Sequence, residues 1–381
     1  MRLTWTDEQT RAYEETLAEV RDRLGDEPGR HGPRSPFTRK RWRLCGELGL
    51  LGLPIPPEYG GRGLGALDSA HLVEAFGRGC PDAGLVFGAS AHLFACAVPI
   101  AEFGRPELKS RILPALCSGD AVAGNAITEE DAGSDVSKLA TTARRDGDGY
   151  VLDGEKTFVT NGPEADVFVV YATTDPTAGF LGATGFVVER DAPGVEVSEP
   201  FGKMGLNGCP AGVLRLDGCR VPDANVLGVP GQGGAIFQHS MTWERSCLFA
   251  GWVGAMERTL ERCVEHARTR RQFGRRIGEF QAVSHRIADM KLRLEAARWL
   301  LYRACWLVDH GEDATVAVAL SKLAVSEAAV QSGLDAISIF GGRGYLVDHG
   351  IEEVLRDAVP TTIFSGTSDI QREMVARGVG L

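Results

Sequence analysis

Apolar residues recur at helical spacing over the first 120 residues of the chain. Glu8 to Leu24 is a charged amphipathic stretch, and Ser69 to Phe103 is an Ala-rich stretch with apolar positions near helical spacing. Between them, the Pro- and Gly-rich segment from Leu53 to Gly65 predicts a loop. Pro114 and Gly119 then interrupt the pattern. We therefore predict an N-terminal helical domain over residues 1–120.

The pattern changes to short β-type runs from Ala121 onward. Turn residues separate these runs, which are Gly149 to Leu152, Asp166 to Ala172, Thr184 to Glu189, Val195 to Ser198 and Gly212 to Leu216. Several short strands without helices between them indicate an antiparallel barrel or sandwich rather than a βαβ sheet. We predict a middle antiparallel β domain over residues 121–232.

Long amphipathic stretches return after the glycine-rich linker from Gly228 to Gly234. They cover Ser240 to Arg268, Phe280 to His310 and Asp313 to Phe340, and a loop follows at Gly341 to Tyr345. Such lengths are typical of a helical bundle. The order of helices, strands and helices predicts an α+β fold whose third, helical domain spans residues 233–381.

The charge balance narrows the classes of function. The 381 residues include 41 Lys and Arg against 51 Asp and Glu, and the net charge of −10 argues against a general nucleic-acid or anionic-membrane binder. The N-terminus lacks the apolar segment of a signal peptide, and the apolar runs are interrupted well short of a membrane span. Nine cysteines without CxxC spacing are typical of reduced thiols in a cytoplasmic protein.

The sequence lacks the motifs of metal, nucleophile and nicotinamide chemistry. The eight histidines are scattered without HExxH spacing, so we expect no metal site. No GxSxG elbow supports Ser/His/Asp catalysis. The glycines of FGGRGY follow no predicted strand, which leaves a nicotinamide-binding Rossmann site unsupported.

Two loops of the predicted β domain suit a flavin. The first, Ala126 to Ser137, offers hydroxyl groups and small residues that allow close approach of the backbone. In the second, Lys156 to Gly162, the aromatic Phe158 and the hydroxyl of Thr160 lie two residues apart, so on a regular strand they share a face. The alternatives are an ordinary turn and a core strand.

A third segment, Arg268 to Gly274, is a basic run that closes a predicted helix. Its positive charge suits a pyrophosphate group. The alternative is that these cations complement the dipole at the helix C-terminus.

Glu244 is the most informative carboxylate of the sequence. On a helix it shares one face with Cys247, Leu248, Gly251 and Ala255. A carboxylate at the head of this small, apolar stripe would be partly desolvated and its pKa raised, as a general base requires. The alternative is an acid that stabilises a helix N-terminus or pairs with Arg245.

Eight segments, taken in order, resemble the acyl-CoA dehydrogenase family over nearly the whole chain. They are LPIPPEYGGRGLG, AITEEDAGSDVS, GEKTFVTNG, FGKMGLNG, TRRQFGRRIGEFQAV, FGGRGY, LRDA and IFSGTSDIQRE. The resemblance implies an N-terminal helical domain, a middle β domain and a C-terminal four-helix bundle. It also implies FAD between the last two domains, with part of its site supplied by a neighbouring subunit of a homotetramer or dimer.

The resemblance transfers cofactor-binding roles to matching positions. Phe158 stands where the family often has Trp against the flavin, and Thr160 stands where a hydroxyl meets flavin N5. The loop that lines the flavin and thioester is matched by Ile127, Thr128, Gly133 and Ser134. The segment that reaches a partner subunit's FAD is matched by Arg270, Gln272 and Phe273, and further cofactor contacts by Gln281, Gly342 and Thr367.

The resemblance also bears on the catalytic base. Many family members place the catalytic glutamate immediately before the Gly-Thr pair of IFSGTS, where this chain has Ser365. In the isovaleryl-CoA and long-chain branches the base comes from a helix with a Glu-Arg pair, and Glu244–Arg245 stands at that place. Glu244 would then take the α-proton of an acyl thioester while the β-hydride passes to flavin N5. The implied substrate-binding residues are Ser134, Arg245, Ser365 and Gly366.

Several activities stay open at the level of sequence. The acyl group is carried on coenzyme A or on a carrier protein; Thr242 replaces an acidic residue of some CoA-using relatives. The chain also resembles biosynthetic relatives that oxidise carrier-bound prolyl groups to pyrrolyl groups. Flavin monooxygenases and non-catalytic flavin-binding proteins share the fold. The electron acceptor is an electron-transferring flavoprotein or O2.

Overall fold

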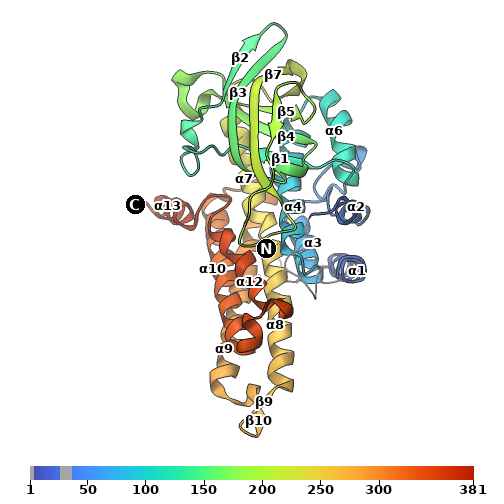
Figure 1. Cartoon of the computed structure of the whole chain (residues 1–381), viewed down its shortest axis with the longest axis vertical. Helices are drawn as coiled ribbons and strands as arrows, with labels where there is room; N and C mark the ends of the chain where they lie inside the picture. The colour runs from blue at the N-terminus through green and yellow to red at the C-terminus, as the bar shows by residue number, and fades with distance from the viewer. Residues whose placement is uncertain (1–3, 26–36) are drawn as a thin grey trace.

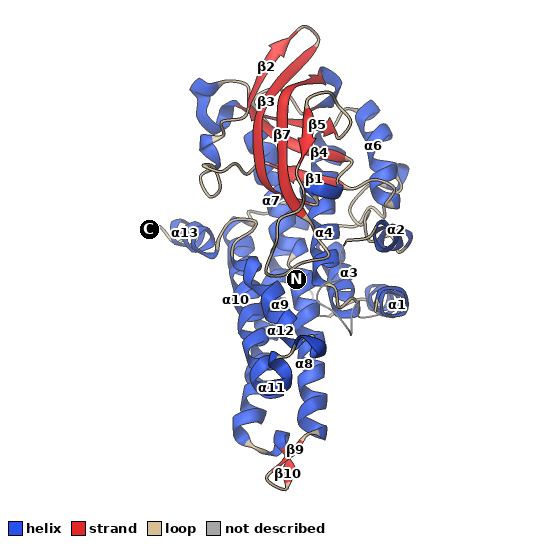
Figure 2. Cartoon of the chain, viewed as in Figure 1, coloured by secondary structure: helices blue, strands red, loops and turns tan. Residues whose placement is uncertain are grey.

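The computed structural model describes residues 4–25 and 37–381. Helices come first, a sheet follows and long helices end the chain, so the predicted α+β fold is confirmed (Figure 1 and Figure 2). The sheet forms the upper end of the molecule in Figure 1, and the C-terminal helices extend away from it.

The described N-terminal region is helical, as predicted. Its helices are α1 (Asp7–Leu24), α2 (Arg39–Glu47), α3 (Ala66–Gly79), α4 (Ala83–Ala91), α5 (Val98–Phe103) and α6 (Pro106–Ser118). Helix α1 begins after Thr6 because the Thr6 side chain accepts from Gln9 N, while the Gln9 side chain accepts from Thr6 N. The predicted loop from Leu53 to Gly65 contains one short 3₁₀ turn, Pro57–Tyr59.

Two helices of the described residues are long and apolar enough to cross a membrane, contrary to the expectation from the sequence. The first joins α4, the π-helical segment η2 (His92–Ala97) and α5, and Pro99, which follows directly on η2, does not end the run. Its most apolar window is 94% buried inside the protein, whereas that of Thr315–Phe340 is 50% buried. The burial of the first helix is typical of a core helix of a folded domain.

The middle region is an eight-stranded sheet. Its strands are β1 (Ala123–Ala126), β2 (Thr142–Asp146), β3 (Gly149–Thr160), β4 (Val167–Thr173), β5 (Ala183–Glu189), β6 (Val195–Val197), β7 (Ala211–Pro222) and β8 (Val226–Leu227). The order is β6-β7-β3-β2-β4-β5-β8, with β1 paired to β4. Most pairs are antiparallel, as predicted, but β1 and β2 each run parallel to β4, so the sheet is mixed.

These parallel pairings place the first flavin-type loop. Ala126 pairs with Val170, and Thr142 pairs with Thr173 on the same strand. β1 and β2 therefore follow one another along β4, and residues 127–141 leave the sheet between them.

Strand β4 is buried on both faces, which joins the sheet to the helices. Val167, Val169 and Tyr171 belong to the large apolar core shared with helices of both helical regions. Alternate residues belong to a second core that lies within the sheet: Phe168, Val170 and Ala172. A strand with two buried faces carries apolar residues at successive positions, as this one does.

The C-terminal region is built from long helices. They are α7 (Gly233–Trp243), the π-helical segment η7 (Glu244–Leu248), α8 (Ala250–Thr269), α9 (Gln281–Asp309), α10 (Thr315–Phe340), α11 (Gly342–Tyr345), α12 (Ile351–Ala358) and α13 (Ser368–Gly378). A small hairpin, β9 (Arg271–Gln272) and β10 (Arg275–Arg276), joins α8 to α9 at the lower tip in Figure 1. The predicted loop at Gly341 to Tyr345 is mostly helix α11, a correction to the sequence analysis.

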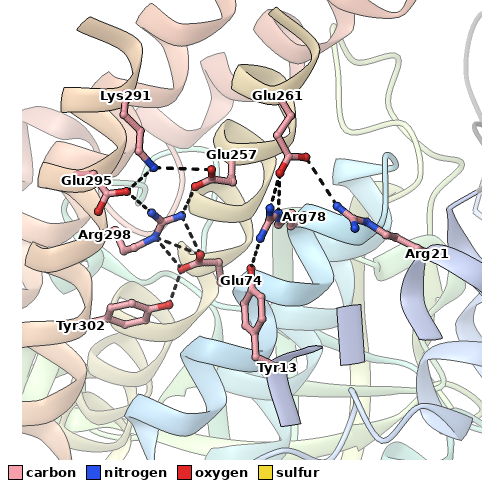
Figure 3. Close-up of polar contacts among 10 residues, drawn as sticks. All are labelled: Tyr13, Arg21, Glu74, Arg78, Glu257, Glu261, Lys291, Glu295, Arg298 and Tyr302. Atoms are coloured by element: carbon pink, nitrogen blue, oxygen red, sulfur yellow. Dashed lines mark hydrogen bonds and ion pairs between the residues drawn. The ribbon is translucent and has the colours of Figure 1, made fainter. Parts of the chain in front are cut away.

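An ionic network fastens the N-terminal helices to the bundle (Figure 3). Arg298 of α9 bridges the buried Glu74 of α3 at 3.0 Å and Glu257 of α8 at 2.6 Å, and the Tyr302 hydroxyl donates to Glu74. Arg78 of α3 pairs with Glu261 of α8. Because Glu74 is buried, its ionised form is stable only with these partners beside it.

Candidate active site

Glu244 lies in the middle of a helical run rather than at its head. Helix α7 begins at Gly233, and Glu244 opens η7, the π-helical segment that leads toward α8. This corrects the predicted stripe: every residue from 244 to 254 is buried, so the apolar surroundings of Glu244 are general and not confined to one helical face. A π-helical segment inside an α-helix is frequent at functional sites.

The Glu244 carboxylate is buried and accepts a hydrogen bond from Ser365, which lies far away in the sequence. Its side chain is 7% exposed, and the Ser365 hydroxyl donates a hydrogen bond to Glu244 Oε1. Burial raises the pKa of Glu244, while the Ser365 hydroxyl and the charge of Arg245 oppose this rise. Glu244 lies inside a helical run and caps no helix N-terminus, whereas the alternative of a charge interaction with Arg245 stays open beside the hydrogen bond from Ser365.

The turn at Ser365 and Gly366 is fixed by two buried side chains. Arg245 Nε donates to Ser365 O at 2.7 Å, and Gln371 Nε2 donates to Gly366 O at 3.1 Å. Ser365 adopts φ of +55° and Gly366 φ of +86°, and positive values are costly for a residue with a side chain. These two hydrogen bonds hold the turn so that the Ser365 hydroxyl faces Glu244.

A buried ion pair fixes the loop that leaves the sheet after β1. Lys156 of β3 is fully buried, and its Nζ lies 2.6 Å from Glu129 Oε1 and 3.2 Å from Ile127 O. Glu129 also accepts from the backbone N–H groups of Ala140 and Thr141. Thr157 N donates to Thr128 O at 2.8 Å. These bonds bring the loops at residues 126–137 and 156–162 together.

Phe158 does not continue the regular strand on which the sequence analysis relied. Its φ is +54°, and the register of β3 with β7 shifts between Lys156 and Val159. The ring is 65% exposed, while Thr160 is partly exposed at the end of the same strand. The bulge, and not simple alternation, presents this aromatic ring.

The two loops fit a flavin. An exposed ring at Phe158 provides a flat apolar face, and three residues with hydroxyl groups, Thr128, Ser134 and Thr160, are not buried. A Cβ built on Gly133 would have no neighbour within 4 Å, so the backbone there is open to close approach. Ile127 is buried beneath this loop.

The third predicted segment lies elsewhere in the chain. Gln272 and Phe273 belong to the hairpin at the far tip of the bundle, away from the sheet in Figure 1, and Arg270 ends α8 just before this hairpin. All three are exposed, and Phe273 has 93% of its surface free. Gln281, at the start of α9, and Gly342, at the start of α11, are exposed too. One chain therefore does not bring the hairpin to Phe158.

Thr367 is already engaged within the chain. Its side chain accepts from Ile370 N and caps α13, one residue after the Gly366 turn. Sequence reasoning missed Gln371 and Lys156. Gln371 lies one helical turn after Thr367, a spacing that returns it to the same face, but Lys156 carried no signal because a lysine in a strand normally points to solvent.

Comparison with known proteins places this geometry in a family. Three family models match the chain: Acyl-CoA dehydrogenase, N-terminal domain, over residues 6–120; middle domain, over residues 124–219; and C-terminal domain, over residues 231–380. The chain belongs to the acyl-CoA dehydrogenase family. It is accordingly an FAD-dependent oxidoreductase that dehydrogenates an acyl thioester.

Similar family members share a narrower description. L-prolyl-[peptidyl-carrier protein] dehydrogenase of Pseudomonas fluorescens is 59% identical over 91% of both chains. A protein of the same description from a Serratia species is 47% identical over 91% of this chain and 89% of its own. The solved structure of PigA with FAD and proline has a TM-score of 0.96 and 43% identity, with full coverage of both chains.

The family assignment leaves the individual residue roles as predictions. Glu244 as base, the cofactor-binding positions and the domain limits at residues 120 and 232 rest on the residues and on the family pattern. Among the described residues, no group of three or more potential metal ligands lies together.

Proposed function

We propose that this chain oxidises an L-prolyl group, carried as a thioester on a peptidyl carrier protein, on the way to a pyrrolyl group. The observation that carries the proposal is the buried Glu244 carboxylate, bonded by Ser365 in place of the family's usual glutamate at that turn. The relatives described as prolyl-carrier-protein dehydrogenases, at 59% and 47% identity, supply the substrate class.

The proposal gives a defined role to each of four residues: Glu244, Ser365, Arg245 and Gln371. Glu244 accepts the α-proton, and the Ser365 hydroxyl stabilises its carboxylate before the proton arrives. Arg245 and Gln371 hold the turn, so the Ser365 hydroxyl stays aimed at Glu244. Bound FAD supplies the hydride acceptor. A formal pyrrolidine-to-pyrrole conversion requires two successive dehydrogenations.

The substrate is tested by anaerobic titration of the purified, FAD-loaded protein. L-prolyl-carrier protein should bleach the oxidised flavin absorbance, and L-prolyl-CoA should bleach it far more slowly. D-prolyl-carrier protein is the matched control, because its α-proton lies on the other face. Bleaching by simple acyl-CoA esters, with none by the prolyl carrier, would contradict the proposal.

The base is tested by Glu244→Gln, which keeps the shape and the bond from Ser365 but removes the proton acceptor. We expect turnover to fall by roughly 10²–10⁴-fold, the usual contribution of a positioned base, with FAD still bound. The exposed Glu312→Gln is the control and should match wild type. Near-normal turnover of Glu244→Gln would exclude this residue as the base.

We also propose a homotetramer, or a dimer, that works in the cytoplasm and passes electrons to an electron-transferring flavoprotein or to O2. All nine cysteines are free and buried, which suits a reducing compartment. Oxygen consumption during turnover, compared with reduction of added flavoprotein, separates the acceptors. Oxygen atoms recovered in the product would instead indicate the monooxygenase alternative.

A further inference from the structure

The loop FGKMGLNG, residues 201–208, contacts both helical regions of the chain. It leaves the sheet after β6 and returns to β7 at Ala211. Leu206 N donates to Asp357 Oδ1 of α12 at 2.6 Å, and Arg356 Nη1 donates to Met204 O at 2.8 Å. Asp357 is 6% exposed. The loop is thus bonded to the C-terminal region by two side chains.

The opposite side of the loop packs on the N-terminus of α4. Asp82 caps α4 by accepting from Leu85 N, and its carboxylate lies against Gly208 so closely that a Cβ there would collide with it. A Cβ on Gly84 would come 2.6 Å from Gly208 N. Leu206 lies between the contacts with α12 and those with α4, and it is buried with φ of +53°. Such a conformation persists where the surroundings hold it.

The loop in turn contacts the segment that presents Phe158. The rings of Phe201 and Phe158 are 5.6 Å apart. Cys209 Sγ donates to Asn161 Oδ1, and Asn161 N donates to Pro210 O at 2.7 Å. The end of β3, with Phe158 and Thr160, is therefore fixed through this loop.

Asp357 also stands on the segment that leads to the base. Helix α12 ends at Ala358, and a single 3₁₀ turn, Val359–Thr362, connects it to Phe364 and Ser365. The Phe364 ring stacks on Phe87 of α4 with centroids 4.4 Å apart. This short segment therefore contacts the loop through Asp357, and it contacts Glu244 through Ser365.

We propose that Asp357 is a positioning residue that sets Phe158 and Thr160, on the sheet, against Glu244 and Ser365, on the bundle, by holding loop 201–208 between them. The predicted flavin contacts Phe158 and Thr160 and the proposed base Glu244 lie on different regions, so their spacing depends on this contact. Asp357 is 6% exposed and accepts from Leu206 N, so it acts on the site through the loop. Loosening its grip on Leu206 leaves each region folded but misplaces Phe158 relative to the turn.

The test compares two alanine substitutions in the same loop. A Cβ on Gly205 would lie 2.5 Å from Arg356 O and 2.6 Å from Asp357 Oδ1, so Gly205→Ala pushes the loop off α12. A Cβ on Gly202 would meet nothing within 4 Å, which makes Gly202→Ala the matched control. The readouts are the FAD dissociation constant, from flavin fluorescence, and the visible circular dichroism of bound FAD. Neither depends on which thioester is the substrate.

We expect Gly205→Ala to raise the FAD dissociation constant at least tenfold and to change the flavin circular dichroism, while Gly202→Ala matches wild type. Equal FAD affinity and spectra in both variants would overturn the proposal.

A second pair of variants separates positioning from folding. Asp357→Asn keeps an oxygen that can accept from Leu206 N, whereas Asp357→Leu removes it. Among protein that is folded by far-ultraviolet circular dichroism, Asp357→Asn should recover most of the affinity that Asp357→Leu loses. Wild-type flavin circular dichroism in folded Asp357→Leu would contradict the role, as would a loss of affinity in Asp357→Asn as large as in Asp357→Leu.

Discussion

At the scale of single residues, the site depends on one hydroxyl that faces one carboxylate. Ser365 occupies the position where many family members carry their base, and here it donates to a glutamate from another helix. Burial alone would favour the protonated form of Glu244, which cannot accept a proton. The hydroxyl and Arg245 act against burial, so they favour the ionised carboxylate that a base requires.

Ser365→Ala tests this balance. The Ser365 bond lowers the pKa of Glu244, so its removal should raise that pKa further, and the ionised base should appear only at higher pH. The acid limb of the plot of kcat/KM against pH is expected to move upward, with FAD affinity unchanged. An acid limb in the same place would show that Ser365 does not tune the base.

At the scale of elements, the loop between β1 and β2 is shaped from beneath by a buried charge pair. Lys156 is fully buried, and burial lowers its pKa to about 8, although Glu129 opposes the shift. The pair fixes Ile127 O and the far end of the loop at Ala140 and Thr141. The hydrogen bond from Thr157 N to Thr128 O lies next to this support.

Lys156→Met would leave Glu129 buried without a cation. We expect the free energy of unfolding to fall by about 3–5 kcal/mol, the usual effect of breaking a buried pair from one side, and the double variant with Glu129→Gln to regain part of it. Denaturant unfolding measures both. Arg215→Met is the control. It breaks the exposed ion pair between Arg215 and Glu155, the residue next to Lys156 on β3, and should unfold like wild type. A similar loss in both single variants would refute the special role of the buried pair.

At the scale of the whole molecule, the predicted cofactor contacts are split between two distant places. The hairpin with Gln272 and Phe273, together with Arg270 just before it, lies at the far tip of the bundle, while Phe158 and Thr160 lie on the sheet (Figure 1). The family pattern assigns this hairpin to the FAD of a neighbouring subunit, and Phe273 is 93% exposed there. We infer that the flavin site is completed between subunits.

Phe273→Ala tests that assembly. We expect weaker FAD binding and a larger share of smaller species by light scattering, because the ring would no longer reach the neighbouring subunit. Leu381→Ala, at an equally exposed position, is the control. A wild-type protein with the mass of one chain and full FAD occupancy would rule out the shared site.

The periodicity of the sequence was enough to predict the order of helices, strands and helices, because burial of apolar faces imposes the same spacing wherever the chain lies. It failed where the backbone departs from regular geometry. The π-helical segment at Glu244 and the bulge at Phe158 both break the spacing on which the sequence analysis relied. The parallel pairings of β4 depend on contacts between distant segments, which no local pattern encodes.

By itself, the sequence determined the fold class and the family and led to the prediction that Glu244 is the base, since residue types and their order along the chain carry that information. Only the tertiary structure showed that Ser365 donates to Glu244, that Lys156 supports the loop and that Asp357 holds Leu206. These partners lie 121, 27 and 151 positions apart. Their contacts arise from packing of whole elements, and a buried polar group takes whichever partner that packing brings within reach.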